Sequence, residues 1–168
     1  VARDWQAMER DGLDMALYAR SRVNKVVPPD IPERVAPMII TWRETLSYVQ
    51  RVGIRKGMRV LVAGSGANAL AFTGHCAYAG ADVCVLGAPA REALFRRGGA
   101  REYIDYHAGD VDARLRAAFP HGIDCFLDAI GYPQNANTVL PLLDPGAVVA
   151  VYGWHARKDY GMDSFLAA

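Results

Sequence analysis

The sequence predicts a doubly wound α/β fold, in which helices cover both faces of a parallel sheet. Short apolar runs alternate with helical segments from residue 57 onward, and turns that contain glycine separate them. The first run, residues 59–63, is apolar on both faces, as expected of a central parallel strand. Strands and helices that alternate at such short intervals indicate repeated β-α-β units and a parallel sheet.

We expect the apolar runs to be strands and the segments between them to be helices. The expected strands span residues 59–63, 82–86, 102–106, 123–128 and 147–152. The expected helices span residues 67–79, 90–97, 110–119 and 134–143. Asp110 is a candidate N-cap for the third of these helices, and Pro141 disturbs the fourth because proline lacks a backbone N–H.

The chain before residue 53 has a different pattern, so we divide it into an N-terminal segment, 1–52, and a domain, 53–168. The segment is expected to be a helical and extended appendage. Its prolines between residues 28 and 32 require an extended or turned chain. A short helix is expected at 33–40, and a second at 41–52, where a one-sided apolar stripe ends at a glycine.

The composition argues against several classes of function. Of the 168 residues 52% are apolar, and the formal net charge is only +1. Such a chain has no broad basic surface for nucleic acid, and no apolar run reaches the roughly 20 residues that a membrane-spanning helix needs. The three cysteines show no paired spacing, which argues against a disulfide scaffold and favours a reducing, cytoplasmic compartment.

The pattern Gly64-x-Gly66-x-x-Ala69 lies between the first expected strand and the first expected helix. In a Rossmann-type dinucleotide site the first glycine allows a tight turn, the second lets the backbone approach a pyrophosphate, and a small third residue lets the helix pack on the sheet. The helix N-terminus then offers N–H groups to the phosphates. The predicted pyrophosphate-binding residues are Gly64, Ser65, Gly66, Ala67 and Asn68. The alternative is a glycine turn that serves helix packing alone.

The end of the second expected strand favours NADP(H) over NAD(H) as the cofactor. An NAD-type site places a carboxylate there to bind the ribose hydroxyls, but this chain reads Leu86-Gly87-Ala88-Pro89. We expect Gly87 and Ala88 to lie near the adenosine ribose and Arg91 to bind a 2′-phosphate. Arg91 could instead be a solvated residue in the first turn of its helix. The missing carboxylate also argues against an S-adenosylmethionine-dependent methyltransferase.

Two further turns follow the fourth and fifth expected strands. Ligands of open α/β sheets bind at the carboxyl ends of the strands, so these turns are expected to face the nicotinamide half of the cofactor. The residues concerned are Ile130 and Gly131 in one turn and Tyr152 and Gly153 in the other. Both could also be ordinary glycine turns. No residue stands out as a proton donor, and the sequence therefore predicts no catalytic set.

Three strings, residues 57–66, 122–131 and 142–153, resemble the cofactor domain of the medium-chain dehydrogenase/reductases, the superfamily of alcohol dehydrogenases and quinone oxidoreductases. The resemblance implies the strand order 3-2-1-4-5 and NADP-type recognition through Arg91. It also implies a parent enzyme that transfers hydride between nicotinamide and a carbonyl, an alcohol or an activated C=C bond. A non-catalytic module that binds nucleotide and senses redox state is the alternative function.

The sequence differs from the family pattern at its two ends and at the expected zinc-ligand position. The catalytic domain lies mostly before this region in the family, and a sixth strand should follow residue 154, so we expect the chain to be part of a longer protein. No cysteine occurs at 38–41, where zinc-dependent members carry a ligand, so the chain resembles the zinc-free branch and no zinc is expected. A small-molecule substrate and a homodimer of the full-length protein are the expected partners.

Overall fold

The computed structural model describes residues 27–153. The chain divides into two compact units, Val1–Pro37 and Met38–Ala168. In the first unit, the described residues form turns. The helix expected at 33–40 is therefore wrong up to Pro37, because proline cannot continue a helix and disfavours helical geometry in the residue before it. The expectations for residues 1–22 and for a sixth strand after residue 154 lie outside the described residues.

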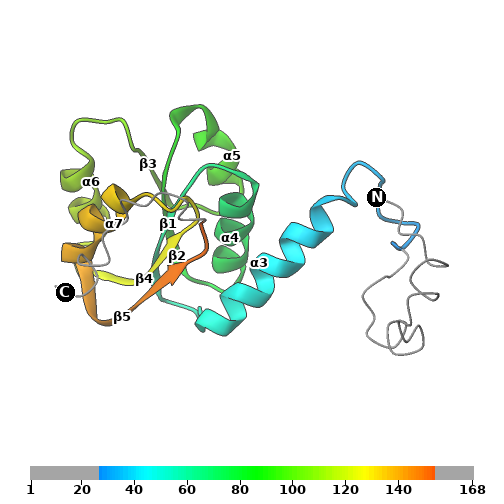
Figure 1. Ribbon diagram of the computed structural model, residues 1–168, viewed down its shortest axis with the longest axis horizontal. Helices are drawn as coiled ribbons and strands as arrows, with labels where there is room; N and C mark the ends of the chain where they lie inside the picture. Colours follow the sequence, from blue (N-terminus) through cyan, green and yellow to red (C-terminus); the bar gives the residue numbers. More distant parts are fainter. Residues whose placement is uncertain (1–26, 154–168) are drawn as a thin grey trace, which may run out of the picture. The chain divides into compact units, whose positions relative to one another are not determined.

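Five parallel strands form one sheet in the order β3-β2-β1-β4-β5, which confirms the predicted fold class and strand order (Figure 1). The strands are β1 Arg59–Ala63, β2 Asp82–Gly87, β3 Glu102–Asp105, β4 Ile123–Asp128 and β5 Leu143–Val151. Ala63 is in register with Leu86 of β2 and with Asp128 of β4. The carboxyl ends of these three central strands therefore meet at one edge of the sheet.

Helices connect the strands and cover both faces of the sheet (Figure 1). They are α3 Met38–Val52, α4 Ala67–Tyr78, α5 Glu92–Arg97, α6 Val111–Ala118 and α7 Pro133–Val139. A short 3₁₀ helix, η1 (Pro89–Arg91), precedes α5, and another, η2 (Leu140–Leu142), follows α7. Asp110 occupies the predicted N-cap position of α6, but its side chain makes no capping hydrogen bond.

The connection from α7 to β5 differs from the prediction. The helix expected at 134–143 ends at Val139, and a 3₁₀ turn accommodates Pro141, which has no N–H for an α-helical bond. Strand β5 begins at Leu143 instead of residue 147. Its pairing with β4 is interrupted between Ile123 and Cys125, where β5 carries extra residues around a glycine with φ +83°.

The core has two halves, one on each face of the sheet. Successive strand residues point to opposite faces, so Val60 and Val62 belong to one half, and Leu61 and Ala63 to the other. The first half includes Val49 of α3, Phe72 of α4 and Phe95 of α5; the second includes Leu115 of α6 and Val139 of α7. All these strand residues are fully buried, as a doubly wound sheet requires.

Candidate functional site

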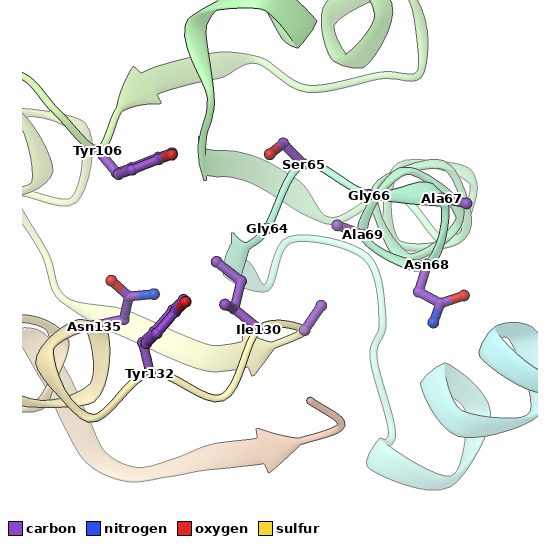
Figure 2. A pocket seen from close by; sticks show the side chains of 11 residues that line it. Gly64, Ser65, Gly66, Ala67, Asn68, Ala69, Tyr106, Ile130, Tyr132 and Asn135 are labelled. Carbon is purple, nitrogen blue, oxygen red and sulfur yellow. The ribbon is translucent and has the colours of Figure 1, made fainter. Parts of the chain in front are cut away.

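A pocket of about 670 Å³ lies at the carboxyl edge of the sheet, beside the N-terminus of α4 (Figure 2). It is lined by Gly64, Ser65, Gly66, Ala67, Asn68, Ala69, Tyr106, Ala129, Ile130, Tyr132 and Asn135. The lining therefore comes from the segments that follow β1, β3 and β4. Figure 2 shows the side chains of Ser65 and Tyr106 pointing toward one another across this space, and Tyr132 pointing toward Ile130. None of the described lining residues carries a charge.

Gly64 makes the turn from β1 into α4 and permits close packing beneath the pocket. Its φ is +140°, a conformation that side-chain-bearing residues rarely adopt. A Cβ at this position would lie 3.0 Å from the Cβ of Ala69 and 3.4 Å from the Cβ of Ala129. Both the glycine and the small residue at 69 are therefore required by packing. The backbone N–H of Gly64 also donates to the carbonyl of Leu86 at 2.9 Å, which ties the turn to β2.

Gly66 serves a different purpose in the same turn. It is the N-cap of α4, with φ −87° and ψ −177°, and α4 has no side-chain capping bond. A Cβ here would meet nothing within 4 Å, so no packing constraint demands a glycine. The space in front of it is the pocket. The first-turn N–H groups of α4 have no intrahelical acceptor, and together with the helix dipole they favour an anion there. A pyrophosphate fits these residues.

Asp128 organises the turn after β4, a role that the sequence reasoning missed. It is only 1% exposed, and its Oδ1 accepts hydrogen bonds from the N–H of Ile130 at 3.0 Å and of Gly131 at 2.9 Å. Its backbone carbonyl accepts from the N–H of Tyr152 at 2.9 Å and of Gly153 at 2.8 Å. One residue thus joins the two predicted turns. An aspartate two residues before the Ile-Gly pair, at a strand end, is the signal that could have indicated this role.

The two predicted turns lie against each other, but of their four predicted site residues only Ile130 is among the residues that line the pocket. A Cβ on Gly153 would lie 2.5 Å from the N atom of Gly131 and 2.8 Å from that of Ile130, so the backbone contact requires glycine. Gly131 is buried. Tyr152 packs edge-on against Phe72 and Tyr48, with ring centroids 4.9 and 5.4 Å away. Gly131, Tyr152 and Gly153 therefore support the turn that contains Ile130, and none of the three lines the pocket.

The predicted adenosine-ribose residues also lie outside the pocket lining. Gly87 is buried at the end of β2, Ala88 is half-buried, and Arg91 is exposed in η1. The backbone N–H of Arg91 donates to the carbonyl of Ala88 at 3.1 Å. The Tyr103 hydroxyl donates to the same carbonyl at 2.7 Å. The structure thus brings Gly87, Ala88 and Arg91 together in one turn, next to the segment that contains Tyr106.

Sequence reasoning missed the lining residues Tyr106, Ala129, Tyr132 and Asn135. Tyr106 follows directly after β3, and its backbone N–H donates to the carbonyl of Gly87 at 3.3 Å. The rule that ligands bind at strand ends could have indicated Tyr106 if it had been applied to the third strand. Tyr132 and Asn135 carry no local signal, because they reach the pocket only through the path of the chain from β4 into α7.

The three cysteines and His75 pack within the fold and lie outside the pocket lining. Cys76, Cys84 and Cys125 are free and fully buried, and burial raises the pKa of each thiol to about 12. Nε2 of His75 lies 3.0 Å from the carbonyl oxygen of Trp42, which ties α4 to α3. Across residues 27–153, no group of three or more His, Cys, Asp or Glu side chains gathers as a metal-binding set.

No helix in the part of the chain that the structure describes combines the length and the apolar character that crossing a membrane would require.

Solved structures with the same fold include several dehydrogenases and reductases. An alcohol dehydrogenase zinc-binding domain protein from Burkholderia ambifaria is 22% identical, with a TM-score of 0.69 over 84% of this chain and 40% of that one. A benzyl alcohol dehydrogenase from Acinetobacter calcoaceticus is 17% identical, with a TM-score of 0.70 over 84% and 41%. CurA from Vibrio vulnificus, solved in complex with NADPH, is 21% identical, with a TM-score of 0.65 over 82% and 45%.

The chain spans about two-fifths of the length of these proteins. At these identities the likeness establishes the fold alone. A profile of the family described as "Zinc-binding dehydrogenase" matches residues 69–167, more than half of the 168 residues. The chain therefore belongs to the zinc-binding dehydrogenase family and corresponds to the cofactor domain of the medium-chain dehydrogenase/reductases.

Proposed function

We propose that this chain binds NADP(H) as the cofactor domain of an oxidoreductase. The reaction of the whole protein would transfer hydride between the nicotinamide and a carbonyl, an alcohol or an activated C=C bond of a small-molecule substrate. The observation that carries the proposal is the pocket in front of α4, where Gly66 leaves open space at the helix N-terminus. The bound nicotinamide supplies the hydride chemistry, and the protein supplies binding and orientation.

The pyrophosphate would be held by backbone groups. Gly64 directs the chain away from β1, and the first-turn N–H groups of Ala67 and Asn68 then stand at the open end of α4. A side chain on Gly66 would project into the space that the phosphates need. The uncharged lining is compatible with this assignment, because the helix N-terminus itself favours a negative group.

Three observations favour NADP(H) over NAD(H). None of the described residues that line the pocket is acidic. Strand β2 ends in Gly87, and Arg91 is exposed in the turn that follows. A guanidinium can form charge-assisted hydrogen bonds to a phosphate. CurA, a structural neighbour, was solved with NADPH bound.

The nicotinamide half is assigned to the end of β4. Ile130 would contact it directly because its side chain lines the pocket. Gly131, Tyr152 and Gly153 would act indirectly, by holding the Ile130 turn through the contacts with Asp128. A homodimer of the full-length protein remains part of the proposal.

Fluorescence titration of the chain with NADPH and with NADH tests the proposed function. We expect saturable binding of both, with the lower dissociation constant for NADPH. Arg91→Ala should weaken NADPH binding by about tenfold, in line with the loss of one charge-assisted hydrogen bond, and leave NADH binding within twofold. Arg97→Ala, on the last turn of α5, is the matched control and should change neither. Equal losses for both cofactors in Arg91→Ala would contradict the phosphate role.

A further inference from the structure

Gly87 has no conformational reason to be glycine. Its φ is not positive, so any residue could adopt its backbone conformation. The constraint is spatial: a Cβ at this position would overlap the Tyr103 hydroxyl oxygen and lie 2.9 Å from Tyr103 Cζ. The Tyr103 side chain thus occupies the space that a side chain at the end of β2 would need. A carboxylate, the usual NAD-type group at this strand end, could not be placed at 87 without displacing Tyr103.

The Tyr103 hydroxyl is anchored on the turn that contains Arg91. Tyr103 is 2% exposed, and its hydroxyl donates to the carbonyl of Ala88 at 2.7 Å. That carbonyl also accepts the backbone N–H of Arg91 at 3.1 Å. The bond from β3 therefore fixes the carbonyl that closes the η1 turn. Without it, the Ala88 peptide could rotate, and the direction in which Arg91 leaves the backbone would no longer be set.

The surroundings of the hydroxyl keep it a donor. Burial, with smaller contributions from Glu92 and Asp105, raises the pKa of Tyr103 to about 12, and the positive charge of Arg91 acts in the opposite direction. The phenol therefore stays protonated throughout the neutral range.

We propose that Tyr103 is a positioning residue for cofactor selectivity. Through Ala88 it holds Arg91 in the orientation that receives the ribose 2′-phosphate, and by filling the space at Gly87 it excludes an NAD-type carboxylate. The inference rests on the proposed NADP(H) binding at this site. It assigns to the β3 residue Tyr103, which lies outside the pocket lining, a part in the choice between NADP(H) and NAD(H).

Tyr103→Phe removes the hydroxyl and keeps the ring in the core. We expect NADPH affinity to fall about fivefold, the worth of one hydrogen bond, and NADH affinity to stay within twofold. In an Arg91→Ala background, Tyr103→Phe should have no further effect on NADPH, because the residue it positions is gone. Tyr78→Phe, at a tyrosine that is 93% exposed, is the matched control and should change neither dissociation constant.

Equal weakening of NADPH and NADH binding by Tyr103→Phe, or an effect that persists without Arg91, would overturn the proposal. If Tyr103→Phe does not fold, Gly87→Ala replaces it. The new Cβ displaces the hydroxyl and also lies 3.2 Å from the Gly64 carbonyl oxygen, so the proposal requires that the loss of NADPH affinity disappear in the Arg91→Ala background. Wild-type chain that binds neither cofactor, or prefers NADH, would refute the proposed function itself. Wild-type preference for NADPH with unchanged selectivity in both variants would refute the Tyr103 role alone.

Discussion

Gly64 and Gly66 lie two residues apart in one turn, and glycine is required at the two positions for different physical reasons. At Gly64 the φ of +140° is strained for any other residue, and a Cβ would press on Ala69 at 3.0 Å. At Gly66 the φ is −87°, and a Cβ would enter open space. Alanine substitutions at the two positions should therefore separate folding from binding.

The cost of Gly64→Ala follows from these two terms. A side-chain-bearing residue held at an unfavourable φ costs about 1–3 kcal/mol. The contact with Ala69, which lies on a buried helix face, adds about 1 kcal/mol, at the lower end of the usual cost of overpacking. We expect a loss of about 2–4 kcal/mol in the free energy of unfolding, a large part of the stability of a typical domain. Gly66→Ala should cost less than about 1 kcal/mol, since alanine is only a poorer N-cap than glycine.

Urea denaturation followed by circular dichroism measures both losses, and NADPH titration of the same samples measures binding. Gly66→Ala should retain most of its stability and lose at least about tenfold in NADPH affinity, because the new methyl group takes up phosphate space. Equal destabilisation by the two variants would refute the packing explanation of Gly64. Unchanged NADPH binding by Gly66→Ala would refute the placement of the pyrophosphate.

Three further predictions concern the scaffold. Asp128→Ala leaves the partly buried N–H of Ile130 and the buried N–H of Gly131 without their carboxylate acceptor and should cost about 2–4 kcal/mol in urea denaturation. Asp128→Asn keeps an Oδ1 acceptor and should cost clearly less, and equal costs would contradict the role of Oδ1. The hydrogen bond and charge of the Arg59 guanidinium hold the pKa of Asp124 below its usual range. The contribution of this ion pair to the free energy of unfolding is therefore complete above about pH 4 and is lost as the pH falls through the lowered pKa. Asp124→Asn should therefore flatten the acid side of the stability profile, and an unaltered profile would rule out this pair as its source. The three thiols should resist a thiol reagent in the native chain and react only after denaturation, because each is buried with a pKa of about 12; rapid labelling of native protein would contradict that burial.

Local patterns were sufficient to predict the central sheet. The bounds of β4 match the prediction, and those of β1 do as well, because both are short buried runs with clear turn residues on either side. The strand order followed from family resemblance. The pyrophosphate end of the site was also predictable, since one contiguous turn provides it. The start of α3 is not set by the apolar pattern, because the helix begins directly after Pro37.

The rest of the site depends on contacts between distant segments. Tyr106, Tyr132 and Asn135 reach the pocket from two connections whose paths are set by the register of the whole sheet. Tyr152 follows a strand end, as the rule requires, but aromatic packing against Tyr48 and Phe72 holds its ring outside the pocket lining. A position in the sequence specifies which strand end a residue follows; the face on which its side chain is buried depends on its neighbours in space.

Isothermal titration of the chain with NADPH tests most directly the claim that the pocket in front of α4 holds a phosphorylated nicotinamide cofactor. We expect saturable binding at one site, a higher dissociation constant for NADH, and a marked loss of NADPH affinity in Gly66→Ala. Absence of binding by both cofactors, in a sample whose cooperative unfolding shows that it is folded, would contradict the proposed cofactor site.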